Sequence, residues 1–280
     1  MKETMQESLQ EIVERAKASS QKNSYKLQGM PCQVCHGAGY LIKTVDGYDI
    51  AEECECLQSR KKENRINFAN IPEAFRDIRL KEFVGSYYKD RESLKNVIDN
   101  VKYWIEHVDE MIENGVGLYL YSHTKGSGKT RMAVSLANEL MYEHDKRVRF
   151  VTSLEVLNEI RAMWNRESRD DSEFSSESQI MRYLNTTEVL VIDDFGTESH
   201  RDWMDDKFYQ IINTRYVNKL VTIFTSNMSI NELRYDDRIN NRIKERSFEI
   251  HFPEESVREI IAEIRTEKMK SEMKGEMKDV

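Results

Sequence analysis

Five short, apolar-rich segments recur along the chain, and amphipathic segments separate them. The segment that ends at Ile192 is continuously apolar, as is typical of a strand buried on both faces. Strands that alternate with helices of this length predict an α/β fold with a parallel sheet covered by helices on both faces. We expect the strands at Gly117–Tyr121, Arg147–Val151, Val189–Ile192, Leu220–Thr225 and Phe248–Phe252.

The segments between these strands repeat apolar residues at the spacing of amphipathic helices. A helix that we expect Ser153 to cap is interrupted by a polar stretch at 166–178. Ser229 followed by Glu232 matches the S-x-x-E capping box, which predicts another helix start. The longer helices are expected at Ser93–Glu113, Lys129–Tyr142 and Met204–Val217, with a closing helix from about Val257 that gives way to a charged tail.

The first 70 residues lack this alternation and predict a separate module. Helical spacing up to about residue 20 predicts a short amphipathic helix, which packs on its own domain or docks on a partner. A cysteine-rich segment and a basic helix, Leu57–Asn70, follow, and Pro72 opens the larger domain. We therefore expect an amino-terminal module at 1–70, a larger domain at 71–262 and a carboxyl-terminal tail at 263–280.

Composition and charge narrow the class of protein. The chain has 280 residues, of which 39% are hydrophobic and 33% charged, as in a globular protein with a highly charged surface. The apolar runs are too short to span a bilayer and the amino terminus carries no secretory signal, so we expect a cytoplasmic protein without a membrane partner. The net charge of −8 means that any nucleic-acid contact must be local or cooperative.

The segment HTKGSGKT lies between a predicted strand and a predicted helix, which is the context of a phosphate-binding loop. Its glycines let backbone N–H groups turn inward around phosphate oxygens. Lys129 can place an ammonium on the β and γ oxygens, and the Thr130 hydroxyl can ligate Mg²⁺. The segment therefore predicts ATP binding by His123, Thr124, Lys125, Gly126, Ser127, Gly128, Lys129 and Thr130. His123 stands where the pattern has its first glycine, so the hydrolysis rate stays open.

Two acids, Asp193 and Asp194, follow the apolar strand that ends at Ile192. Paired carboxylates repel each other, so a bound cation would explain why they lie together. We assign Asp193 and Thr130 to Mg²⁺, and Asp194 to the attacking water as its general base. Asn227 ends the next strand, at the same edge of a parallel sheet, where its amide can orient that water. A simple Ser/Asn turn is the alternative for Asn227.

Arg238 and Arg242 are one helical turn apart and share a helix face. Either arginine can stabilise charge on the γ-phosphate of a neighbouring subunit, and a solvated basic face is the alternative. A further constellation lies near the amino terminus. Its cysteines are clustered in a chain expected to be cytosolic, which favours a structural Zn²⁺ over disulfides, with His36 as an alternative ligand. The expected zinc ligands are Cys32, Cys35, Cys54 and Cys56.

The larger domain resembles AAA+ ATPases, most closely the DnaC/DnaI/IstB branch that includes bacterial and phage replicative-helicase loaders. The motifs that carry the resemblance are, in chain order, HTKGSGKT, VLVIDDFG, TSN, DDRINNRI and SVR. The resemblance implies a P-loop α/β/α domain with a five-stranded parallel sheet. It also implies the following roles: Lys129 and Thr130 as the Walker A pair, Asp193 and Asp194 as the Walker B acids, Asn227 as sensor I, Arg242 as the arginine finger with Arg238 in reserve, and Arg258 as sensor II.

The resemblance implies an ATPase that delivers a DnaB-type helicase to single-stranded DNA and self-associates through its ATP sites. Slow hydrolysis suits such a protein, because a switch needs different affinities in its two states and not fast turnover. The cysteine-rich module is similar to that of the Gram-positive DnaI-like loaders, where this region binds the helicase. The alternatives are an IstB-type transposition-helper ATPase that assembles on duplex DNA, or a zinc adaptor with a degenerate ATP site.

Overall fold

The computed structural model of the protein describes residues 32–45, 48–158, 177–197 and 202–276. The chain divides into two compact units, Met1–Arg65 and Ile66–Val280. The expected helix before residue 20 and most of the polar stretch at 166–178 lie outside the described residues. Within the described part, no helix is both long and apolar enough to cross a membrane.

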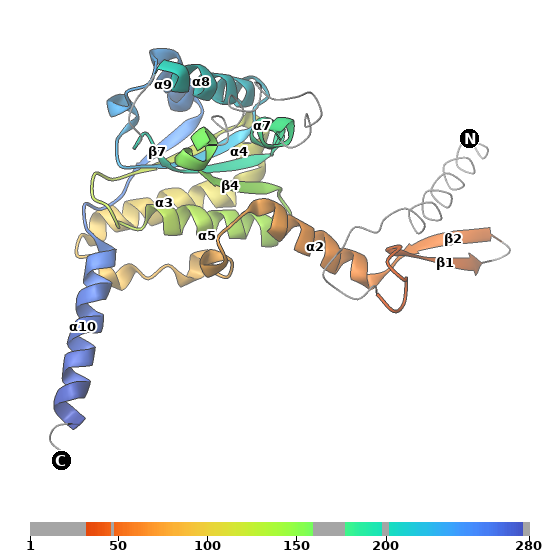
Figure 1. Cartoon of the computed structure of the whole chain (residues 1–280), viewed down its shortest axis with the longest axis horizontal. Coiled ribbons are helices and arrows are strands. Elements are labelled where there is room, and N and C mark those ends of the chain that lie inside the picture. The colour runs from red at the N-terminus through yellow and green to blue at the C-terminus, as the bar shows by residue number, and fades with distance from the viewer. Residues whose placement is uncertain (1–31, 46–47, 159–176, 198–201, 277–280) are drawn as a thin grey trace. The chain divides into compact units, whose positions relative to one another are not determined.

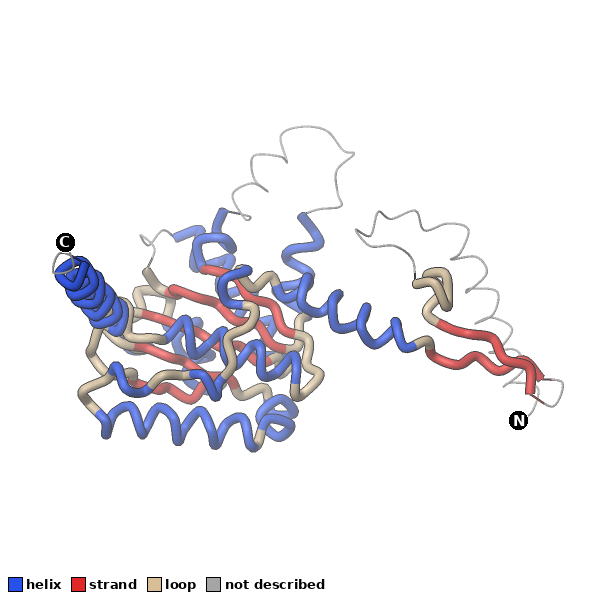
Figure 2. Tube along the Cα trace, turned by 90° about the horizontal axis from the view of Figure 1, so that it is seen from below, coloured by secondary structure: helices blue, strands red, loops and turns tan. Residues whose placement is uncertain are grey.

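The second unit contains a sheet of five parallel strands, which confirms the predicted fold class. The strands lie in the order β4-β5-β6-β3-β7, and Figure 2 shows them in red between the blue helices. Because all strands are parallel, their carboxyl ends meet at one edge. Their bounds are Gly117–Tyr121 for β3, Val148–Thr152 for β4, Val189–Phe195 for β5, Val221–Ser226 for β6 and Ser247–His251 for β7.

Alternate strand residues enter two hydrophobic cores, one on each face of the sheet. In β3, for example, Leu118 and Leu120 join one core and Tyr119 joins the other. The first core contains residues of α3 (Arg91–Glu106), α4 (Val108–Asn114) and α5 (Lys129–Tyr142). Residues of α7 (Glu177–Thr186), α8 (Asp202–Val217) and α9 (Asp237–Glu245) form the second (Figure 1). The domain therefore has three layers.

The structure corrects three of the expected helix boundaries. The segment expected as one helix at Ser93–Glu113 is two, α3 and α4, with a break at His107. Thr152 and not Ser153 caps the helix after β4, in a capping box with Glu155. Thr152 Oγ1 accepts from the Glu155 N–H, and the Glu155 carboxylate accepts from the Thr152 N–H. The closing helix α10 (Val257–Glu276) continues through most of the expected tail.

The described part of the first unit contains the cysteine-rich segment, a hairpin and the start of a helix. The strands β1 (Tyr40–Val45) and β2 (Tyr48–Glu53) pair antiparallel, and α2 (Glu55–Ala69) begins in this unit and ends in the second. Apolar side chains of the hairpin remain exposed, including Ile42 and Ile50 at 49% each. A two-stranded hairpin without a buried face is marginally stable at best, so the described part of this unit needs another source of stability.

Candidate functional site

A cavity of about 630 Å³ opens at the carboxyl edge of the sheet, where the loop between β3 and α5 meets the ends of β5 and β6. Most of the residues that the sequence assigned to nucleotide binding line this cavity. They are Lys125, Gly126, Ser127, Gly128, Lys129, Thr130, Asp193, Asp194, Asn227 and Arg258. Residues far apart in the chain are therefore brought to one place.

The two glycines of the loop have left-handed backbone conformations, with φ of 81° at Gly126 and 96° at Gly128. A Cβ at Gly128 would lie 2.3 Å from the hydroxyl oxygen of Tyr88, so this position cannot take a side chain without movement. The Tyr88 hydroxyl is buried against the loop and donates to the carbonyl of Ser127 at 2.7 Å. Tyr88 therefore supports the loop from outside, which the sequence did not reveal.

Replacing Tyr88 by phenylalanine removes this hydrogen bond and leaves the Ser127 carbonyl without it. We expect the free energy of unfolding to fall by about 1–3 kcal/mol, the usual cost of a buried acceptor that loses its donor. Thermal or denaturant unfolding measures the change. Tyr87→Phe is the matched control, because Tyr87 is not buried, and an equal loss in both variants would contradict the role of Tyr88.

The Lys129 side chain is held inside the loop. Its ammonium donates to the carbonyls of Ser122 at 3.2 Å and Thr124 at 3.1 Å, and to the Ser127 hydroxyl at 3.1 Å. Burial lowers its pKa, whereas the nearby charges of Asp194, Glu254 and Asp193 raise it. A partly buried cation whose partners are neutral oxygens can bind an anion such as a phosphate group, and Lys129 lines the cavity where one would lie.

Asp193 and Thr130 meet across the cavity wall. The Thr130 hydroxyl donates to Asp193 Oδ1 at 2.9 Å, and the Thr225 hydroxyl donates to the same oxygen. Burial raises the pKa of Asp193, and the two hydrogen bonds offset only part of this increase. A carboxylate and a hydroxyl side by side are the hard oxygen donors that Mg²⁺ prefers, so the residues fit the cation that the sequence assigned to them.

Asp194 has an unusual backbone that turns its side chain outward. Its φ is 54°, in the left-handed region, at a register shift of β5 between Ile192 and Phe195. Three hydroxyls hold it there: its N–H donates to Thr225 at 3.0 Å, and its carbonyl accepts from Ser153 at 2.9 Å and Thr197 at 2.8 Å. Asp193 is thus buried, while its neighbour is exposed and lines the cavity.

Two of the assigned residues lie elsewhere, because His123 and Thr124 are not among those that line the cavity. Their backbone N–H groups donate to Glu254, at 3.0 Å and 2.8 Å. The His123 ring contacts Glu254 and Glu232. Hydrogen bonds to both carboxylates raise the pKa of His123, and the bond to Glu232 has the larger effect. The local sequence gave no sign of these glutamates, which come from distant segments.

The two arginines of α9 do not line the cavity either. The Arg242 Nε donates to Asn213 at 2.8 Å, and its guanidinium lies 4.9 Å from the Tyr209 ring centre. Arg238 pairs with Asp236 at 3.0 Å and is more exposed. A finger that acts on a neighbour's nucleotide must lie outside its own cavity, so this placement is compatible with either arginine. The role stays a prediction.

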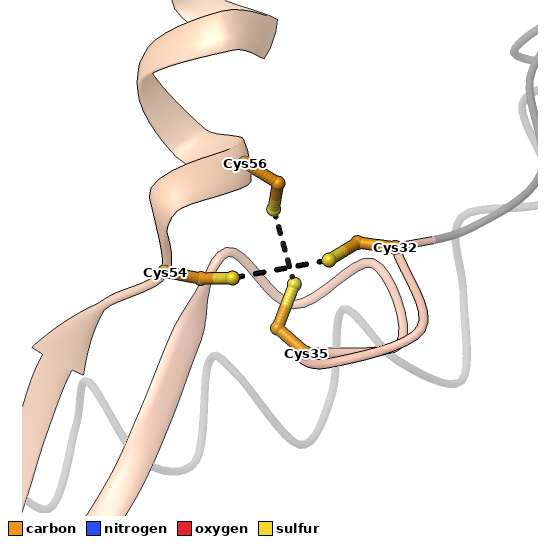
Figure 3. A group of neighbouring side chains, drawn as sticks. All are labelled: Cys32, Cys35, Cys54 and Cys56. Carbon is orange, nitrogen blue, oxygen red and sulfur yellow. Dashed lines mark hydrogen bonds between the residues drawn. The ribbon is translucent and has the colours of Figure 1, made fainter.

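The four cysteines converge in the first unit. Their sulfurs lie within 4.8 Å of one another, with Cys32 and Cys54 at 3.9 Å and Cys35 and Cys56 at 3.3 Å, and Figure 3 shows them pointing toward one point. Tetrahedral Zn²⁺ with Zn–S bonds of about 2.3 Å needs sulfurs about 3.8 Å apart. The group therefore fits zinc, and it consists of the four sulfurs without His36.

A basic side chain stabilises this sulfur group. The Arg60 guanidinium donates to Cys56 Sγ at 3.0 Å and approaches Cys35 Sγ at 3.6 Å, and it also donates to the Gly37 carbonyl at 2.7 Å. Burial raises the pKa of Cys35, but several hydrogen bonds lower it, the largest from the Gly39 N–H. The net result is a pKa of about 6. Burial raises the pKa of Cys56 to about 12, so within this group it is Cys35 whose thiolate is the readier metal ligand.

Because the hairpin buries so little, we expect removal of zinc to unfold the first unit. Small zinc modules owe about 10–16 kcal/mol of apparent binding energy to the metal. Limited proteolysis of the full chain should show rapid cleavage of the hairpin after treatment with a chelator or in Cys54→Ser, while nucleotide binding by the second unit persists. An unchanged cleavage rate would show that the metal does not stabilise this unit.

Comparison with known proteins gives a consistent result. The family described as IstB-like ATP binding protein matches residues 42–241. The phage-like element PBSX protein XkdC of Bacillus subtilis is 25% identical over 210 residues, which cover 72% of this chain and 73% of that protein. The replicative helicase loader DnaI of Bacillus subtilis is 30% identical over 138 residues, which cover 46% of this chain and 41% of DnaI.

Among solved structures, the DnaC helicase loader has the same fold, with a TM-score of 0.54. It is 21% identical, and the likeness covers 65% of this chain and 99% of that one. The chain thus spans most of the length of XkdC but less than half of the length of DnaI.

Proposed function

This chain belongs to the family of IstB-like ATP-binding proteins, and we propose that it is an ATP-dependent loader that delivers a DnaB-type helicase to single-stranded DNA in the cytoplasm. The observation that supports the proposal most is the assembly of the loop, Lys129, Asp193 and Asp194 around one cavity at the carboxyl edge of the sheet. Two relatives, DnaI and DnaC, are named as replicative helicase loaders.

The polar residues that the sequence assigned to the cavity have separate tasks in this proposal. Lys129 and the loop N–H groups bind the phosphates, and the oxygens of Thr130 and Asp193 hold Mg²⁺, which neutralises charge on the phosphates when bound. Asp194 accepts a proton from the attacking water, which Asn227 orients. Arg258 reaches the cavity from α10, and its Cβ would lie 3.1 Å from a Cβ at Gly126.

The position of Arg258 suggests how nucleotide would act as a switch. Both the phosphate loop and α10 line the cavity, so a bound nucleotide would contact the two elements at once. A ligand shifts an equilibrium only through different affinities for two states, and contacts to two elements can supply that difference. We propose that ATP favours self-association through the α9 arginines, and that slow hydrolysis reverses it.

Retention of the helicase tests this proposal. Full-length protein on a support should retain a DnaB-type hexamer in the presence of ATP and Mg²⁺. Cys54→Ser should retain less, because the proposal assigns helicase binding to the amino-terminal module, whereas the ATP site of that variant stays intact. If the full-length protein retains no DnaB-type hexamer in any nucleotide state, the loader proposal fails while ATP binding can still hold.

A transposition-helper ATPase is the second candidate, favoured by the description of the family that matches residues 42–241. Such a protein would assemble on duplex DNA without a helicase. ATP-dependent assembly on duplex DNA, measured by sedimentation with and without a DnaB-type hexamer, separates the candidates. The net charge of −8 counts against the transposition-helper candidate, because binding to duplex DNA depends on basic side chains that neutralise the phosphates.

A further inference from the structure

A second group of metal-binding side chains lies beside the phosphate loop and outside the nucleotide cavity. His123 follows β3, His251 ends the neighbouring strand β7, and Glu254 lies in the connection from β7 to α10. One donor atom from each of the three residues lies within 4.8 Å of the others. The group takes no part in the proposed chemistry of ATP.

The two histidines converge on a single carboxylate oxygen. His123 Nδ1 lies 3.1 Å and His251 Nε2 2.7 Å from Oε1 of Glu254. All three side chains are partly exposed, at 55% for His123, 50% for His251 and 38% for Glu254, so a cation can reach them from solvent. A cation placed among these atoms would replace the two contacts between the imidazoles and the carboxylate.

We propose that His123, His251 and Glu254 form a binding site for a divalent cation of the Zn²⁺ class. Two imidazole nitrogens and one carboxylate are a common ligand set for zinc and its neighbours Co²⁺ and Ni²⁺, whereas Mg²⁺ and Ca²⁺ prefer oxygen ligands alone. Three protein ligands leave at least one position for water. The site is distinct from the four cysteines and does not rest on the loader function.

Glu232 supplies the arrangement expected around a metal-binding histidine. The outward nitrogen of His123, Nε2, lies 3.0 Å and 3.2 Å from the two carboxylate oxygens of Glu232. A histidine that binds a metal almost always donates its other N–H to a carboxylate, carbonyl or water, which fixes the tautomer. Donation from Nε2 to Glu232 leaves the Nδ1 lone pair of a neutral His123 free to face the cation.

The ligands and Glu232 are also fixed by their own neighbours. Glu232 accepts from the N–H and hydroxyl of Ser229, at 2.8 Å and 2.7 Å. The Tyr121 ring stacks on His251 with ring centres 4.7 Å apart, and the two residues are partners in the register of β3 and β7. Glu254 is held by the N–H groups of His123 and Thr124. The site is therefore preorganised and needs little ordering to bind.

Binding of the cation would join the start of the phosphate loop to the segment that leads into α10. That segment already contacts the loop, because Ser256 and Arg258 lie against Gly126. The histidine at the first position of the loop, where the usual pattern has glycine, thus gains a task of its own as a metal ligand.

Cobalt titration of the full chain tests the proposal. Co²⁺ bound by thiolates has a strong sulfur-to-metal charge-transfer band, and Co²⁺ bound by imidazole and carboxylate lacks it, so absorption combined with equilibrium dialysis separates the two sites. Wild type should bind an equivalent of Co²⁺ that adds nothing to the thiolate band. His251→Ala should lose that equivalent and keep the band. His107→Ala is the matched control, because His107 is also exposed but lies outside the group.

Glu232→Gln provides a test that does not remove a ligand. Glutamine can serve in the same capping box, so the fold around Ser229 should persist. Loss of a carboxylate behind a metal-binding histidine lowers the affinity for the metal by about 10–100-fold. We expect this decrease in affinity for the Co²⁺ that is not bound by thiolates. The proposal is overturned if wild type binds no Co²⁺ outside the thiolates, or if His251→Ala or Glu232→Gln binds it as tightly as wild type.

Discussion

Replacing Lys129 by alanine is expected to weaken ATP binding by about 30- to 5000-fold. The ammonium lies inside the loop with only neutral oxygens as hydrogen-bond partners. In the proposed complex this ammonium forms a charge pair with a phosphate of ATP. Removing one member of a buried charge pair costs about 2–5 kcal/mol, which corresponds to that range in Kd. Calorimetric titration of the full chain with ATP and Mg²⁺ measures the effect.

Lys95→Ala is the control for the loss of a lysine, because Lys95 is exposed on α3 and does not line the cavity. Lys129→Met keeps most of the apolar stem, which separates the loss of charge from the loss of packing. If both variants at Lys129 bind ATP as wild type does, the cavity is not the nucleotide site. If wild type itself binds no nucleotide, the chain acts as an adaptor with a degenerate site.

Replacing Asp194 by asparagine is expected to slow ATP hydrolysis by about 10²- to 10⁴-fold while ATP binding stays within a few-fold of wild type. A positioned general base contributes a factor of this size. Asparagine is suited to the site, because Asp194 has a φ of 54° and asparagine tolerates the left-handed region better than most residues. Phosphate release under single-turnover conditions measures the rate.

Asp99→Asn is the control for the loss of a carboxylate, because Asp99 is exposed on α3. A loss of ATP binding in Asp194→Asn equal to its loss of hydrolysis would contradict the assignment of separate tasks to the two acids. In that case Asp194 would share in holding the cation with Asp193.

The central strands were predictable because the parallel sheet buries both of their faces, as in β3 and β5. Gly117–Tyr121 was expected with its observed bounds, and Val189–Ile192 was expected without its last three residues. Those residues include the two acids, whose polarity ends the apolar run although the backbone still pairs at Phe195. Apolar patterning therefore identified the apolar part of β5 and missed the end that carries the two acids, although Asp193 and Phe195 are buried as well.

The hairpin in the first unit was not expected, and its composition explains why. Its apolar side chains are exposed and mixed with charged ones, so no alternation between a buried and a solvated face marks the strands. Its two strands come directly before Cys54, the cysteine that precedes α2. The cysteines were visible in the sequence because ligand spacing is local, whereas the fold around them was not.

The residues that support the cavity at the carboxyl edge of the sheet were missed for a different reason. Tyr88 contacts Ser127 across 39 positions of sequence, and Thr225 contacts Asp193 across 32. Thr225 stood in the TSN segment, but only Asn227 received a task from it. Motifs show residues that contact ligands, and the residues that hold those motifs in place depend on tertiary contacts, which a single sequence does not display.

The most direct test of the loader proposal is transfer of a helicase to closed circular single-stranded DNA. A DnaB-type hexamer cannot thread onto a closed circle without opening, so DNA-bound helicase after gel filtration reports loading. With full-length wild type, ATP and Mg²⁺, we predict helicase on the circle, and we predict none with Lys129→Ala. Equal loading with wild type, with Lys129→Ala and without this protein would contradict the account.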